Sequence, residues 1–77
     1  MTRTEILRLR KYLNNKFGSD EFTLQNSQAK DESVEVHFKD EFLGIIYKDE
    51  DEGEISYAFQ IAILEIDLPS AADTSLI

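Results

Sequence analysis

The chain has 77 residues, no cysteine, one histidine and a formal net charge of -8. A chain of this length forms one small domain, and without cysteine it has no disulfide, no thiolate metal ligand and no thiol nucleophile. No apolar stretch approaches the roughly 18 residues of a membrane span, and the first residues lack the apolar run of a signal peptide. We therefore expect a cytoplasmic protein without a membrane partner.

The positive and negative charges are separated along the chain. Residues 1–18 carry five basic side chains and one acidic side chain, a net charge of +4. Residues 19–77 carry three basic and fifteen acidic side chains, a net charge of -12. An acidic body repels nucleic acid, because nucleic-acid binding depends on neutralising phosphates. A nucleic-acid-associated adaptor that uses the basic helix remains an alternative. Its contacts would come from Arg3, Arg8, Arg10 and Lys11.

The N-terminal segment has the pattern of an amphipathic helix over residues 3–17. Thr2 and Glu5 have the spacing of a capping box, and Gly18 stands where a glycine commonly follows a helix. Apolar side chains recur at spacings of three and four, which places them on one helix face. These are Ile6, Leu9, Leu13 and Phe17.

Three or four strands are expected after the helix. Residues 22–24 form a short, weak candidate, and residues 34–38 alternate apolar and polar side chains as a half-buried strand does. Residues 42–47 are apolar at both odd and even positions, so both faces of this strand are apolar. This pattern indicates a central strand. From Ile55 the alternation continues to Ile63, so far that we expect a bulge near Ala62.

This order predicts an α+β fold in which the N-terminal helix packs on a three- or four-stranded antiparallel meander. Pro69 ends the pattern and small polar residues follow. We expect a single domain over residues 1–68 and a disordered tail over residues 69–77. The predicted core consists of Leu9, Leu13, Val36, Phe38, Ile46, Phe59 and Ile61.

The acidic stretch at residues 49–54 is interpreted as a solvated hairpin turn, since five of its six residues are acidic. It does not form an EF-hand loop. With Asp49 as the first ligand, Gly53 falls at the fifth position and Glu54 at the sixth, where glycine is required. A weak divalent-metal site in this turn remains an alternative, but we expect Asp49, Glu50, Asp51 and Glu52 to be exposed and metal-free at physiological calcium.

No pattern in the chain predicts catalysis. Exposed carboxylates lack the burial or cleft that shifts a pKa towards a catalytic value. His37 lies on the polar parity of its strand, and no serine or cysteine is placed as its nucleophile partner. We therefore expect a protein that is not an enzyme, with no catalytic residue, cofactor or resident metal.

One resemblance covers about residues 1–68. The residues that carry it are Tyr12-Leu13, Phe17-Gly18, Gly44, Tyr47, the acidic stretch with Gly53, Ser56-Tyr57, Gln60, Ile63-Leu64 and Asp67-Leu68. In these residues the chain resembles a small alphaproteobacterial family of domains of unknown function. The resemblance implies a stand-alone bacterial protein and brings no activity, ligand or catalytic residue with it.

Surplus apolar surface is the strongest functional signal in the sequence. One helix of about four turns covers only one face of a sheet, and apolar area left in water commonly marks an interaction surface. We expect a protein-interaction or structural module that binds a protein partner or a second copy of itself, as a homodimer. The predicted partner-binding residues are Leu43, Ile45, Tyr47, Leu64 and Ile66.

Overall fold

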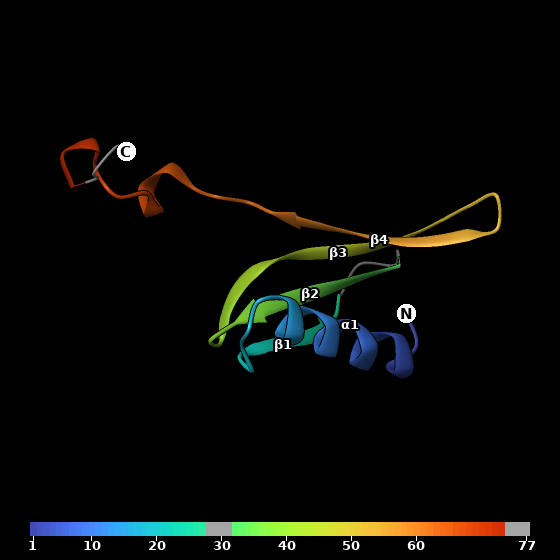
Figure 1. Cartoon of the computed structure of the whole chain (residues 1–77). Helices are drawn as coiled ribbons and strands as arrows, with labels where there is room; N and C mark the ends of the chain where they lie inside the picture. Colours follow the sequence, from blue (N-terminus) through green and yellow to red (C-terminus); the bar gives the residue numbers. More distant parts are fainter. Residues whose placement is uncertain (28–31, 74–77) are drawn as a thin grey trace.

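The computed structural model describes residues 1–27 and 32–73 as a helix, a four-stranded sheet and an extended C-terminal segment (Figure 1). The strands pair in the order β1-β2-β3-β4, and every pair is antiparallel. The α+β fold with an N-terminal helix on a meander is therefore confirmed. The elements are α1 (Arg3–Lys16), β1 (Phe22–Asn26), β2 (Ser33–Phe38), β3 (Glu41–Asp51), β4 (Glu54–Ile61) and the short 3-10 turns η1 (Glu65–Asp67) and η2 (Ala71–Asp73).

The start and end of α1 follow from side chains that the sequence predicts. The amide N–H of Glu5 donates to the Thr2 hydroxyl at 3.1 Å, and the amide N–H of Thr2 donates to Glu5 Oε1 at 3.0 Å. This reciprocal pair satisfies two amides that the first turn of a helix leaves without partners. After the last turn, Gly18 adopts a φ of 59°, the left-handed conformation that favours glycine.

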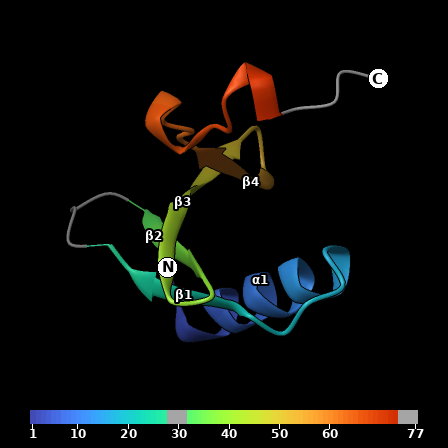
Figure 2. The same ribbon diagram turned by 90° about the vertical axis from the view of Figure 1, so that its left-hand side faces the viewer.

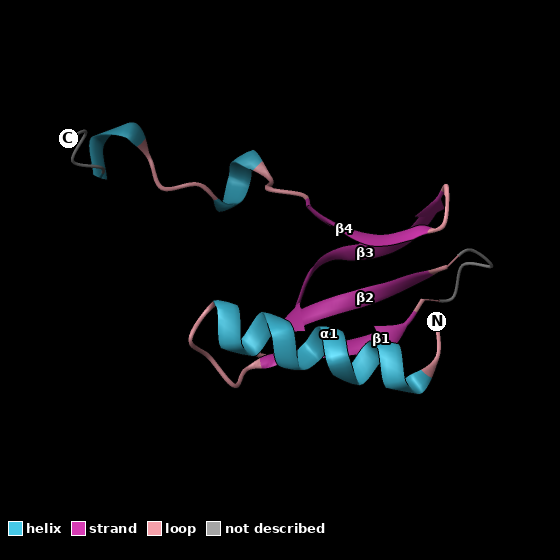
Figure 3. Ribbon diagram, turned by 45° about the vertical axis from the view of Figure 1, so that its right-hand side comes forward, coloured by secondary structure: helices cyan, strands magenta, loops and turns pink. Residues whose placement is uncertain are grey.

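Hydrogen bonds between α1 and β1 fix where the helix lies. The Asn14 side chain accepts from the amide N–H of Phe22 at 2.9 Å and donates to the carbonyl oxygen of the same residue at 3.4 Å. Arg10 Nε donates to that carbonyl oxygen at 3.3 Å. These bonds hold α1 beside the edge strand β1, and β4 lies at the far side of the sheet (Figures 2 and 3).

The core lies between α1 and the first three strands. Its buried side chains are Leu13, Phe22, Val34, Val36 and Ile46. Of the seven predicted core residues, three belong to this set, and Leu9, Phe38 and Phe59 are half-buried against it. Ile61 does not belong, because its side chain is 46% exposed. That prediction is wrong because α1 is held over β1 and does not reach the end of β4.

Two tight hairpins connect the last three strands. Lys39 and Asp40 join β2 to β3 with φ angles of 52° and 65°, and Glu52 and Gly53 join β3 to β4 with 50° and 82°. Two consecutive positive φ angles suit the right-handed twist of a two-residue hairpin. The acidic turn is therefore shorter than predicted, since residues 49–51 extend β3 and residue 54 begins β4.

The sheet irregularity lies in β3. The register between β2 and β3 shifts between Val36 and His37, so that Leu43 is the extra residue on β3. The bulge expected near Ala62 is wrong, because β4 ends at Ile61 opposite Gly44. Figure 1 shows β3 curving away from β4 beyond this point, which leaves later residues without a strand to pair with.

The segment Ala62–Leu68, here called the arm, extends away from the rest of the domain (Figure 1). It contains η1 and exposes four large apolar side chains, Ile63, Leu64, Ile66 and Leu68. The predicted tail at residues 69–77 includes η2, and its last four residues lie outside the described residues. Within the described residues, no helix is long and apolar enough to cross a membrane.

Candidate functional site

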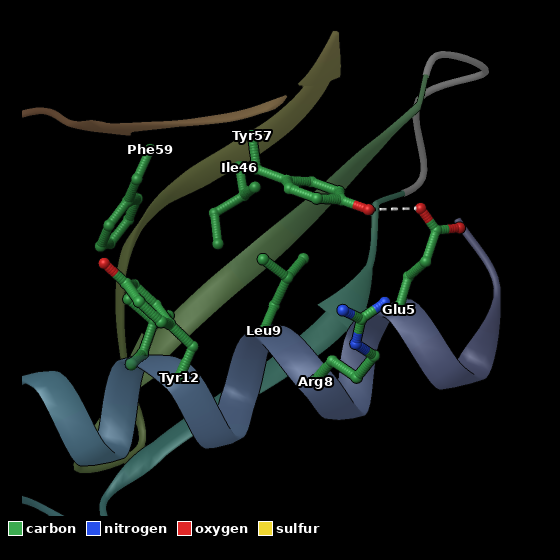
Figure 4. A pocket seen from close by; sticks show the side chains of 8 residues that line it. Glu5, Arg8, Leu9, Tyr12, Ile46, Tyr57 and Phe59 are labelled. Atoms are coloured by element: carbon green, nitrogen blue, oxygen red, sulfur yellow. Dashed lines mark hydrogen bonds between the residues drawn. The ribbon is translucent and has the colours of Figure 1, made fainter. Parts of the chain in front are cut away.

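An open groove separates α1 from β4. Because the helix is held over β1, a cavity of about 360 Å³ remains between its inner side and the last two strands (Figure 4). Its lining comes from every second residue of the strands and from successive turns of the helix. The lining residues are Glu5, Arg8, Leu9, Tyr12, Leu13, Ile46, Tyr57 and Phe59.

The middle and one end of the groove are apolar. Leu9 from α1 and Ile46 from β3 point towards each other, and Tyr12 and Phe59 come together at the end nearer the helix C-terminus (Figure 4). Ile46 is buried, whereas Tyr12 is 59% exposed. Apolar surface that remains in contact with water carries a free-energy cost of about 25 cal/mol per Å², so this surface favours a partner that covers it.

A polar cluster closes the other end. Glu5 Oε2 accepts a hydrogen bond from the Tyr57 hydroxyl at 2.7 Å and lies 2.8 Å from Lys48 Nζ. Glu5 Oε1 also accepts from the amide of Thr2. One carboxylate thereby connects the first turn of α1 with β3 and β4, and we call Glu5, Lys48 and Tyr57 the hub.

The three side chains of the hub shift one another's pKa values. The Lys48 ammonium, then the Thr2 amide and the Tyr57 hydroxyl, stabilise the ionised carboxylate and lower the pKa of Glu5 from 4.5 to about 2. The hydrogen bonds that Lys48 and Tyr57 donate to the Glu5 carboxylate raise the pKa of both side chains. A carboxylate held this strongly in its ionised form is a weak proton acceptor, so the hub is suited to fastening the helix to the sheet.

The five predicted partner-binding residues occupy three separate places. Leu43, the extra residue of the β3 bulge, is partly buried and packs against the core. Ile45 and Tyr47 alternate with Ile46 and therefore lie on the sheet face turned away from α1, where both are half-buried. Leu64 and Ile66 lie on the arm with exposed fractions of 56% and 89%.

The outer sheet face has a shallow hollow beside Ile45 and Tyr47. At the end of β4 this hollow reaches the sheet edge, and its other lining residues are Phe42, Gly44, Gln60, Ile61 and Ala62. The ring of Phe42 meets the His37 ring edge-on, with centroids 5.8 Å apart. His37 Nε2 is buried and lies 3.4 Å from Glu35 Oε1, without a hydrogen bond among the described residues. Polar neighbours thus interrupt the apolar surface on this face.

The acidic hairpin brings no ligand set together. Asp49, Glu50 and Asp51 point alternately to the two faces of β3, because successive side chains of a strand do so. In the described part of the chain, no three histidine or acidic side chains converge as a metal site requires. That the hairpin stays metal-free at physiological calcium remains a prediction.

The basic side chains of α1 differ in what they contact. Arg10 is hydrogen bonded to the backbone of β1, and Arg8 lines the groove. Arg3 and Lys11 are exposed. No observation on these side chains favours a nucleic-acid ligand over a protein.

Sequence reasoning missed the groove and the hub. Two signals indicate the hub: Glu5 is the one acidic residue in an otherwise basic helix, and it is the acidic member of the capping box with Thr2. Lys48 and Tyr57 are direct cross-strand partners, but this follows only from the two-residue turn at Glu52 and Gly53. The groove depends on where the helix lies, which apolar spacing does not specify.

The family of this chain is shown by a comparison with protein families. The model of a family of proteins of unknown function, DUF3126, matches residues 5–67. The chain belongs to this family. The match takes in almost all of α1, the whole sheet and the arm as far as Asp67. No curated protein and no solved structure is significantly similar to the chain.

The family match agrees with the resemblance to a domain family without assigned activity. An alphaproteobacterial origin stays a prediction. Because the match continues past β4, the arm belongs to the domain that defines the family and is not an addition to it.

Proposed function

We propose that this protein is a non-enzymatic protein-interaction module whose contact surface consists of the groove, β4 and the arm. The observation that carries the proposal is where the exposed apolar side chains gather. Among the described residues, seven of the eleven large apolar side chains that are exposed lie between residues 55 and 68. They are Ile55, Tyr57, Ile61, Ile63, Leu64, Ile66 and Leu68.

This concentration differs from the scattered apolar residues that any protein surface carries. It combines the uncovered strand β4, whose outer edge has no paired strand among the described residues, with a neighbouring segment that projects into solvent. An exposed strand edge and a row of exposed apolar side chains are both typical of surfaces that bind another polypeptide. The surface thus offers backbone hydrogen bonding and apolar contact together.

The side chains with shifted pKa values support a role in binding and not in catalysis, and the lack of cysteine supports the cytoplasm as the location. In the part of the chain that the structure describes, the side chains with shifted pKa values are Glu5, Lys48 and Tyr57, and they shift because they are hydrogen bonded to one another. Each is therefore occupied in joining α1 to the sheet. The absence of cysteine fits a protein of the cytoplasm, where disulfides rarely form.

Site-specific photo-crosslinking in the cells that make the protein tests this function. A photoreactive phenylalanine derivative replaces Ile61 on the contact surface, and in a matched control it replaces Gln25, which is exposed on β1. Light should produce a covalent adduct with a polypeptide at position 61 and none at position 25. An absence of adducts at position 61, or equal adducts at both positions, contradicts the proposed function.

A further inference from the structure

We infer that the occupant of the groove is the arm of a second copy of this chain, so that two copies form a reciprocal homodimer. This inference rests on the proposed function and names its partner. Each copy carries one groove and one arm. A two-fold axis therefore fills both grooves and covers both arms, which closes the assembly at two chains.

The arm is placed to leave its own domain. Leu64 and Leu68, which flank η1, have extended backbones with φ/ψ angles of -85°/138° and -78°/144°, so the chain does not reverse at either end of the turn. Figure 1 shows the arm continuing from β4 away from α1. The molecule is consequently elongated, at 47 × 26 × 24 Å. The arm of a copy thus lies out of reach of that copy's groove and within reach of another.

Length and apolar content also match. The six residues from Ile63 to Leu68 include η1, so they span about 16 Å, with about 2 Å per residue in the turn and about 3.3 Å per residue beside it. The groove side of α1 runs from Glu5 to Tyr12, which is about 10 Å of helix plus the side chains at each end. The arm therefore reaches along the whole groove. Ile66, at 89% the most exposed large apolar residue of those described, would meet the apolar stretch at Leu9 and Phe59.

The charges of the two surfaces are complementary. On the arm, Ile66 lies between Glu65 and Asp67, and both carboxylates are exposed. Arg8 lines the groove next to its apolar stretch, on a segment whose net charge is +4 over residues 1–18. An apolar side chain flanked by two carboxylates fits an apolar groove with an arginine at its rim, and opposite charges fix the orientation of such a contact.

Sedimentation of the purified full chain tests the inference. The unmodified chain should have a sedimentation mass of twice 8.9 kDa, and the dimer should dissociate on dilution. Ile66→Asp should reduce the mass to that of one chain at concentrations where the unmodified chain is dimeric, because it places a charge in the apolar groove. The matched control is Phe42→Asp, since Phe42 is also exposed, at 55%, but lies on the outer sheet face. This control should remain dimeric.

Charge reversal provides a second, independent test. Arg8→Glu should weaken the dimer at least tenfold, and Glu65→Arg with Asp67→Arg should do the same. Combining all three substitutions should restore association, since the opposite charges again face each other. All these side chains are exposed, so circular dichroism should show every variant folded.

The outcomes separate the inference from the proposed function. A chain that sediments as a monomer at every concentration, or an Ile66→Asp variant that stays dimeric, overturns the arm exchange. The loss of the dimer in Phe42→Asp alone would assign the contact to the outer face and overturn it as well. If the chain is monomeric but the adduct at position 61 contains a different polypeptide, the proposed function stands and the second copy is excluded. If neither association nor adducts occur, both fail.

Discussion

The two halves of the sheet differ in what covers them. In the half formed by β1 and β2, Phe22, Val34 and Val36 are at most 4% exposed beneath α1. In the half formed by β4, Ile55 and Ile61 are 55% and 46% exposed, although they lie on the same face of the sheet. The uncovered apolar surface of this protein therefore lies beside its helix as well as on the opposite face.

The difference arises from polar contacts and not from hydrophobic pattern. β4 is as regularly apolar as β2, so an apolar helix stripe would gain area over either strand. Asn14 decides between them, because its side chain binds both the amide and the carbonyl of Phe22 at the exposed edge of the sheet. The Asn14 side chain replaces the water that α1 displaces from these partly buried groups, and each such hydrogen bond contributes about 0.5–1.5 kcal/mol. The helix is held at one edge, and the groove is the result.

The largest expected effect comes from truncating the covered half. Leu13→Ala should lower the free energy of unfolding by about 2–5 kcal/mol, because Leu13 is 5% exposed and its removal leaves a cavity. Ile61→Ala should cost less than about 1 kcal/mol in the same background. Both are made in the Ile66→Asp chain, so that association does not protect Ile61. Urea unfolding followed by circular dichroism measures the two values, and equal losses would contradict the difference between the halves.

A smaller effect is expected at the border between the halves. A Cβ atom on Gly44 would clash with the carbonyl oxygen of Gln60 and press on the Phe59 ring, so Gly44→Ala must separate β3 from β4. Such overpacking costs about 1–3 kcal/mol. Gly53→Ala adds a Cβ in open space but at a φ of 82°, and its cost is therefore limited to backbone strain. Amide hydrogen exchange should show faster exchange at the amides that join β3 to β4 in Gly44→Ala, and unchanged protection there would disprove the close approach.

Sequence patterns predict the covered half well because its determinants are local. The capping box at Thr2 and Glu5, the stripe containing Leu13 and the alternation of β2 each depend on residues close in sequence. The uncovered half depends on contacts across the fold. Asn14 gives no local sign that it binds Phe22, and nothing near Ile61 shows that β3 curves away from it.

The acidic hairpin illustrates the same limit in another way. Asp and Glu are poor strand residues, so a stretch of five carboxylates favours a turn. At a hairpin end exposed to water on both faces that preference is weak, and the pairs Asp49 with Ser56 and Glu50 with Ile55 extend the sheet. The turn shortens to the two residues, Glu52 and Gly53, that adopt positive φ. The longer hairpin is what brings Lys48 and Tyr57 side by side for the hub.

The smallest expected effect tests how the hub holds the helix against the uncovered half. The pKa of Glu5 is about 2 in the folded chain, below its ordinary value of 4.5. Its contribution to stability is therefore complete above pH 4.5 and is lost as the pH falls towards 2, because the unfolded chain binds the proton first. Glu5→Gln retains the capping side chain but not the charge. Its stability should accordingly fall below that of the unmodified chain at neutral pH, and the two should converge between pH 4.5 and 2.

The control Glu54→Gln removes an exposed carboxylate of β4 outside the hub. If unfolding measured across this range shows a constant gap between Glu5→Gln and the unmodified chain, the hub does not depend on the ionised carboxylate, and apolar contact at Leu9 alone holds α1 to the groove side of the sheet.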